Sequence, residues 1–152
     1  LAELGGLTKD GAPPFHAWLS DNNGTEISSA VDRLHPNASP ELQAGYMLPG
    51  GPMLAINFEA LSSGLMSAIA KDEAGQPIAG TPSVWSNTSV GGEALGLVDN
   101  MGDPTSCENW HSATFEHVGE RGIATQAQPS WTQIAPVQHC STPSQLYCFQ
   151  AG

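Results

Sequence analysis

Short hydrophobic runs alternate with turn-forming residues along the chain. Residues 15–19 alternate between turn-rich flanks, which predicts a strand. The runs 46–48 and 53–55 flank a Pro-Gly-Gly-Pro sequence at 49–52, which predicts a β-hairpin. No run approaches the roughly 18 apolar residues that a membrane-spanning helix needs, so we expect no membrane span.

Three segments predict short helices or single helical turns. Residues 28–34 form the first, with one of the two leading serines as its cap. Residues 57–61 form the second, which is capped by Asn57 and ends near Gly64. The third begins at Cys107–Trp110. Because the chain also holds 17 Gly and 12 Pro, which break helices or mark turns, a loop-rich α+β domain is favoured over a helical bundle.

The rest of the chain predicts strands set among loops. Strands are expected at 84–86, around Trp131 and at 146–149, and a polar turn is expected at 71–76. Residues 87–106 form the most irregular stretch. Neither an internal repeat nor a linker is visible, so we expect one domain spanning residues 1–152.

The first seven residues predict the last turn of a helix. Gly5 or Gly6 would end that helix in the left-handed conformation, and Leu7 would pack back onto it. Most of the helix would lie upstream of Leu1, so we expect its N-terminal part to be truncated.

The charge balance excludes two classes of partner. Four Lys and Arg against fifteen Asp and Glu give a net charge of −11. Binding to nucleic acid or to an anionic membrane needs clustered basic residues, so neither partner is expected.

The number of cysteines is odd. They are Cys107, Cys140 and Cys148. In a secreted chain this implies a free thiol, an intermolecular bond or a partner outside the sequence, and in a cytosolic chain three reduced cysteines. Sequons begin at Asn23, Asn37 and Asn87; they fit an exported protein, although chance explains them as well in a chain rich in Ser, Thr and Asn.

An ordered set of residues runs through nearly the whole chain. It comprises Gly6-Leu7, Phe15-His16-Ala17-Trp18-Leu19-Ser20-Asp21, Val31-Asp32-Arg33-Leu34, Val84-Trp85, Gly91-Gly92, Cys107 with Trp110, Gly119, Gly122, Trp131-Thr132, Cys140 and Leu146-Tyr147-Cys148-Phe149. This set resembles the endostatin-like domains, which have the C-type-lectin-like fold, and is closest to their secreted bacterial relatives. The resemblance implies a loop-rich α+β fold with antiparallel strands and one or two short helices.

The resemblance also implies a disulfide arrangement. Bridges in the family are nested, the first cysteine with the fourth and the second with the third. Cys107 and Cys140 match the second and third, so a bridge between them is expected. Cys148 matches the fourth, and its partner would be a cysteine outside this chain.

The sugar-binding calcium site of C-type lectins is not carried over. Its Glu-Pro-Asn or Gln-Pro-Asp triplet is replaced by Gln76-Pro77-Ile78, and its Trp-Asn-Asp triplet has no match. A separate group of oxygen-bearing residues lies in or beside one long loop: Glu93, Asp99, Asn100, Asp103 and Glu108. Hard cations take six to eight oxygen ligands, so a bound metal would be Ca²⁺ at this loop. The alternative is a solvated acidic loop without metal.

The four tryptophans are expected to be core residues. Trp85 and Trp110 would flank the Cys107–Cys140 bridge. The alternative is that one tryptophan forms a ligand-stacking face, and Trp131 would be that residue because Pro129-Ser130 precedes it.

No catalytic motif is present, so an enzyme is not expected. His139 beside Cys140 would suggest a thiol nucleophile only if Cys140 were free. His117 next to Glu116, or three residues before Glu120, could pair a base with an orienting carboxylate. The histidines lack zinc-ligand spacing, and two arginines give no heparin-binding surface.

These observations lead to two main hypotheses of function. The first is a non-catalytic extracellular recognition or adhesion module that binds a protein or glycan through loops between residues 71 and 106. The second is a structural subunit that self-assembles at the cell surface or after secretion. A hydrolase built on the same scaffold is a third.

Overall fold

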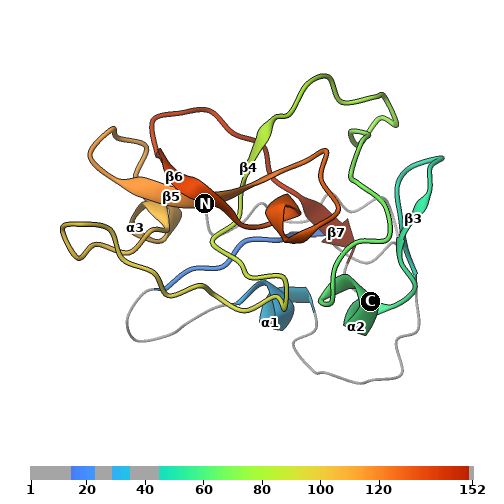
Figure 1. The fold of residues 1–152 in the computed structure, drawn as a ribbon, viewed down its shortest axis with the longest axis horizontal. Helices are drawn as coiled ribbons and strands as arrows, with labels where there is room; N and C mark the ends of the chain where they lie inside the picture. Colours follow the sequence, from blue (N-terminus) through green and yellow to red (C-terminus); the bar gives the residue numbers. More distant parts are fainter. Residues whose placement is uncertain (1–14, 23–28, 35–44, 151–152) are drawn as a thin grey trace.

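The computed structural model describes residues 15–22, 29–34 and 45–150. It is a mixed α+β structure with short elements joined by long loops (Figure 1). The elements are β1 (Phe15–Ala17), α1 (Ala30–Leu34), β2 (Tyr46–Met47), β3 (Met53–Ala55), α2 (Phe58–Leu61), β4 (Ser83–Trp85), α3 (Cys107–Trp110), β5 (Val118–Ile123), the 3₁₀ turn η1 (Pro129–Trp131), β6 (Ile134–His139) and β7 (Cys148–Gln150). Within the described ranges, none of the helices is long and apolar enough to cross a membrane.

The strands form three small antiparallel sheets. The two-stranded sheet β1–β7 pairs segments from opposite parts of the chain, with Ala17 opposite Cys148 (Figure 1). The sheet β2–β3 is the expected hairpin. The third sheet has the order β4–β5–β6. The strands predicted near residues 15, 84 and 146 are thus confirmed in place, with shifted bounds.

A large aromatic cluster forms the main core. The rings of Trp18 and Trp131 lie 5.1 Å apart, and both side chains are fully buried. Tyr147 and Phe149 pack on Trp131, and the Tyr147 hydroxyl donates to the Trp131 carbonyl at 2.9 Å. Trp131 therefore lies in η1 at the centre of the core, which confirms the expectation that it is a core residue. The strand predicted there and the alternative of a ligand-stacking surface were wrong.

A second, smaller cluster surrounds the disulfide. Cys107 and Cys140 are bonded with an S–S distance of 2.07 Å, which confirms the expected bridge. Leu19 and Trp110 are buried beside it, and the half-buried Trp85 packs against the same cluster. The ring centroids of Trp85 and Trp110 lie 5.9 Å apart, so both tryptophans flank the bridge as predicted.

Strands β5 and β6 were not predicted from the sequence. Strand β5 has the sequence Val-Gly-Glu-Arg-Gly-Ile, which lacks the alternation of apolar and polar residues that predicts a strand. A Cβ atom at Gly122 would lie 1.9 Å from the Trp131 carbonyl oxygen, and one at Gly119 would lie 2.8 Å from Cys107 Sγ. The missing side chains let the central strand of this sheet approach both clusters of buried side chains.

The N-terminal N–H groups of α2 and α1 find their hydrogen-bond acceptors in different ways. Asn57 caps α2 as predicted, since its Oδ1 accepts from Ala60 N at 2.8 Å. The N-terminal donors of α1 instead find distant partners: Ala30 N donates to Ser20 Oγ at 2.9 Å. The Ser29 side chain bonds elsewhere, so its predicted capping role was wrong. The other candidate cap, Ser28, and the predicted helix at 1–7 lie outside the described residues.

The predicted turn at Cys107–Trp110 forms with left-handed backbone. Its four residues have φ values from 52° to 66°. Such a conformation costs about 1–2 kcal/mol per non-glycine residue. Tertiary contacts offset this cost: the disulfide fixes Cys107, and Trp110 Nε1 donates to the Ser20 carbonyl at 2.8 Å.

Candidate functional site

The five residues predicted to bind calcium are placed in three separate surroundings. Asp99 and Asp103 lie in one turn, with Asn100 exposed between them. Glu93 accepts a hydrogen bond from Ser29 Oγ at 3.3 Å, and Glu108 lies on α3. Among the described residues, no group of three or more His, Cys, Asp or Glu side chains is arranged to hold a metal ion. That a metal bound by this loop would be Ca²⁺ stays a prediction, as does the alternative of a solvated loop without metal.

The Asp99 carboxylate has a local role in its turn. Its Oδ1 accepts from Met101 N at 2.8 Å and from Asp103 N at 3.0 Å. Asp72 accepts in the same way in the turn 72–76, and Ser89 Oγ accepts from Glu93 N in the turn 89–93. The fourth residue of each turn is a glycine with φ between +77° and +89°: Gly75, Gly92 and Gly102. The three turns are thus of one type, a tight turn closed by a left-handed glycine, and two of them, 89–93 and 99–103, account for much of the irregular stretch 87–106.

A closed cluster of buried hydroxyl groups holds residues 86–88 on the core. Thr132 Oγ1 accepts from Trp18 Nε1 at 2.8 Å and donates to the Thr88 carbonyl at 2.8 Å. Ser86 Oγ lies 2.7 Å from Thr132 Oγ1, and Ser20 Oγ lies 2.9 Å from Thr88 Oγ1. These side chains are inaccessible to solvent, so the cluster is structural.

Asn87, the first residue of one sequon, is buried next to this cluster. Its Nδ2 donates to the Ser20 carbonyl at 3.2 Å, and only 1% of the residue is exposed. An oligosaccharide cannot be accommodated on this side chain in the folded protein. The sequons at Asn23 and Asn37 lie outside the described residues.

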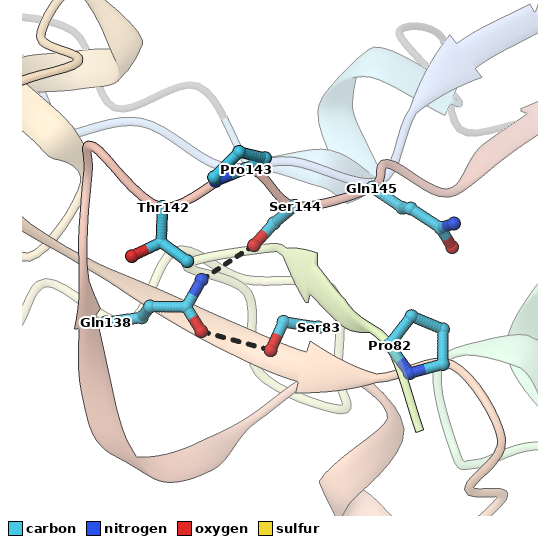
Figure 2. A pocket seen from close by; sticks show the side chains of 7 residues that line it. All are labelled: Pro82, Ser83, Gln138, Thr142, Pro143, Ser144 and Gln145. Atoms are coloured by element: carbon cyan, nitrogen blue, oxygen red, sulfur yellow. Dashed lines mark hydrogen bonds between the residues drawn. The ribbon is translucent and has the colours of Figure 1, made fainter. Parts of the chain in front are cut away.

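An open pocket of about 390 Å³ lies between β4, β6 and the loop that follows β6 (Figure 2). It is lined by Pro82, Ser83, Gln138, Thr142, Pro143, Ser144 and Gln145. All of these side chains are uncharged, and each is exposed or half-buried. The pocket therefore offers hydroxyl and amide groups beside two proline rings.

A relay of hydrogen bonds runs along the pocket floor. Arg121, on the neighbouring strand β5, donates through one guanidinium NH₂ to Ser83 Oγ at 2.9 Å and through Nε to the Pro136 carbonyl. Ser83 Oγ donates to Gln138 Oε1 at 3.1 Å, and Gln138 Nε2 donates to Ser144 Oγ at 2.7 Å (Figure 2). The relay fixes the orientation of the Gln138 amide and ends at the Ser144 hydroxyl.

The backbone around Gln145 closes one side of the pocket. Trp85 N donates to the Gln145 carbonyl at 2.9 Å, and Gln145 N donates to the Ser83 carbonyl at 3.0 Å. This segment occupies the edge of β4 that β5 leaves open. The side chains of Thr142 and Gln145 form no hydrogen bond within the described ranges, so they can bond to a ligand.

Most of the residues that line the pocket were not predicted from the sequence as binding residues. Only Pro82 and Ser83 fall within the loops between 71 and 106 that were expected to bind a partner. The others belong to 138–145, where a run of Ser, Thr and Pro lies between two cysteines. That composition is typical of a turn and carries no mark of a pocket.

None of the histidines that the structure describes lines the pocket. His139 Nδ1 lies 2.7 Å from the Phe115 carbonyl oxygen, and the two rings stack at 3.8 Å. Because Cys140 is in the disulfide, a thiol nucleophile beside His139 is excluded. His117 Nε2 lies 3.4 Å from Glu108 Oε1, a carboxylate that the sequence did not single out as its partner.

One carboxyl group and the free thiol have raised pKa values. Burial raises the pKa of Glu120 above its ordinary value, and the neighbouring Arg121 guanidinium opposes this shift. Partial desolvation and the Glu73 carboxylate raise the pKa of the Cys148 thiol. Cys148 is unpaired and exposed in β7, so a Cys140–Cys148 bridge is excluded. Bonding of Cys148 to a cysteine outside this chain stays a prediction.

No family model, curated protein or solved structure matches this chain. The features that bear on function are the pocket, the disulfide and the exposed side chains.

Proposed function

We propose that this chain is a non-catalytic extracellular recognition module with a C-type-lectin-like, endostatin-like fold, which binds a glycan through the pocket around Gln138. The observation that carries the proposal is the neutral lining of hydroxyls, amides and proline rings in a chain of net charge −11. A pocket of about 390 Å³ with a few oriented polar groups suits a small ligand.

The pocket chemistry supports binding rather than bond cleavage. The hydroxyl groups of the lining belong to Ser83, Thr142 and Ser144. Ser83 and Ser144 bond to Gln138, which cannot remove a proton, and Thr142 has no base bonded to its hydroxyl among the described residues. Hydroxyl and amide groups donate and accept hydrogen bonds, as sugar hydroxyls do. The rings of Pro82 and Pro143 supply apolar contacts for the C–H faces of a sugar.

The closed edge of β4 favours a glycan over an extended peptide. A peptide that adds a strand to a sheet gains affinity from main-chain hydrogen bonds. The Gln145 segment already occupies that edge beside the pocket. A ligand here depends on side-chain contacts, which a compact polyhydroxylated ring can make.

An extracellular location is consistent with the Cys107–Cys140 disulfide. Structural disulfides form and persist in oxidising compartments and are rare in the cytosol. The proposal therefore places the module outside the cell, where glycans of surfaces and matrices are accessible.

A glycan array followed by an NMR titration tests the proposal. Bound glycans should shift the amide signals of Gln138, Ser144 and Gln145, and Gln138→Leu should abolish binding. Gln126→Leu changes an exposed glutamine outside the pocket lining and serves as the matched control. Turnover of a bound glycan would favour the hydrolase hypothesis, and a complete absence of glycan binding would contradict the proposal.

One observation supports the alternative that the chain is a structural subunit of an assembly. Four large apolar side chains on or near the β2–β3 hairpin are at least 38% exposed: Met47, Met53, Ile56 and Met66. Contact between copies of this chain would remove them from water. Light scattering over a range of concentrations tests this alternative; a monomer at every concentration would rule it out.

A further inference from the structure

The polarity of the hydrogen bonds in the pocket is set at the Arg121 end. A guanidinium carries only donors, so Ser83 Oγ receives a hydrogen bond there and directs its own O–H toward Gln138 Oε1. The amide then directs Nε2 toward Ser144 Oγ. Every bond in the relay runs the same way, from the cation toward the open end of the pocket.

The open end of the relay consequently presents donors. The Ser144 oxygen accepts from Gln138, which leaves its hydroxyl hydrogen for another acceptor. The second N–H of the Gln138 amide has no partner within the described part of the chain. A ligand group that bonds to this second N–H of Gln138 must therefore accept a hydrogen bond, and the Ser144 hydroxyl can donate to the same acceptor.

Charge and shape restrict that acceptor further. An anionic group would approach a chain of net charge −11 with only four Lys and Arg, so long-range repulsion disfavours it. A carbonyl oxygen is a strong neutral acceptor. The prolines at 82 and 143 provide apolar surface next to the donors, which suits a methyl group attached to that carbonyl.

We infer, on the basis of the proposed function, that the pocket selects N-acetylated sugars, with the acetamido carbonyl accepting from Ser144 Oγ and Gln138 Nε2. The acetamido methyl packs on a proline ring. Thr142 and Gln145, which have free hydroxyl and amide groups, contact the ring hydroxyls. Arg121 acts as a positioning residue, since it reaches the ligand only through Ser83 and Gln138.

The test compares two disaccharides of the same linkage, N,N′-diacetylchitobiose and cellobiose, by NMR titration of the chain. We expect the acetylated sugar to bind at least tenfold more tightly, with shifts at Ser144 and Gln138. Equal affinities would overturn the inference and leave glycan recognition standing. No shift at the pocket with either sugar, or with other glycans from the array, would overturn both. Decaproline serves as a peptide probe, and pocket binding of it alone would also overturn both.

Two variants test the direction of the relay. Gln138→Glu keeps the acceptor for Ser83 and replaces the donor facing Ser144 by a second acceptor, so the tenfold preference should disappear. Gln126→Glu makes the same change of charge at an exposed position outside the pocket and should keep the preference. Ser144→Ala should weaken binding of the acetylated sugar about tenfold and cellobiose less. If Gln138→Glu folds and keeps the preference, the assigned direction is wrong.

Discussion

The buried cluster around Thr132 and the pocket around Gln138 are built from the same kinds of side chain. In the buried cluster, the hydroxyls of Ser20, Ser86, Thr88 and Thr132 bond to one another and to the backbone, and solvent reaches none of them. In the pocket, the relay from Arg121 ends at the hydroxyl of the half-buried Ser144, and nearby polar groups lack a partner within the described ranges.

This difference indicates how hydroxyl-rich sequences divide between structure and recognition. A buried polar group destabilises the fold unless it is paired, so the closed cluster contributes to stability only while every member is present. An exposed group exchanges its bonds with water at little cost, so it can be exchanged again for a ligand. Four substitutions and one change of calcium concentration test the difference between closed and accessible polar groups, in order of decreasing expected effect.

Trp110→Ala should produce the largest loss of stability, about 3–5 kcal/mol. The substitution opens a cavity beside the disulfide and removes the donor to the Ser20 carbonyl in the closed cluster. Urea denaturation measures the change in the free energy of unfolding. An unchanged midpoint would contradict the core assignment of Trp110.

Thr132→Val should destabilise the protein by about 3 kcal/mol. It keeps the shape of the side chain but leaves Trp18 Nε1 without its acceptor in the core. Thr132→Ser is the matched control, since it keeps the hydroxyl and loses only one methyl group, at a cost of about 1 kcal/mol. If both variants lose the same stability, the hydrogen bonds of the closed cluster contribute little.

Glu120→Gln should stabilise the protein at pH 7 and change its pH dependence. Burial raises the folded-state pKa of Glu120 above its unfolded value, so the folded state holds the proton more tightly. The wild-type therefore loses stability as pH rises from the unfolded-state pKa through the folded-state pKa, and the glutamine variant lacks this loss. Melting curves between pH 3.5 and 7 should diverge toward pH 7. If the difference in melting temperature between the wild type and Glu120→Gln stays constant with pH, titration of the Glu120 carboxyl group does not cause it.

Ser144→Ala should change the free energy of unfolding by less than about 0.5 kcal/mol. The Gln138 amide that it leaves is half-buried, so water can replace the lost partner. The same urea titration used for Thr132→Val makes the comparison direct. A loss as large as that of Thr132→Val would show that the relay is a structural cluster like the buried one.

Calcium should have the smallest effect. Hydrogen bonds from backbone N–H groups to Asp99 already order the turn 99–103. We expect the same melting curve in EDTA and in millimolar Ca²⁺. An increase in melting temperature that Asp103→Asn abolishes would establish the calcium site at this loop.

Features that depend on neighbours in the sequence were predicted well. The hairpin around 49–52, the Asn57 cap and the polar turn at 71–76 are each specified by a few adjacent residues. The Cys107–Cys140 bridge was anticipated from the family resemblance and confirmed. Of the candidate site, only Pro82 and Ser83 lay in the loops expected to bind a partner.

The sequence by itself determined an α+β chain of short elements, a strongly acidic net charge and the turns at 49–52 and 71–76, because these follow from composition and local conformational preference. Tertiary structure decided the burial of Trp131, the left-handed turn at Cys107–Trp110 and the course of β5 past both cores. It also decided which hydroxyl groups are closed off and which remain available. Each of these depends on partners distant in the sequence, and a Ser or Thr has the same local preferences whether its hydroxyl is bonded in the core or exposed in a pocket.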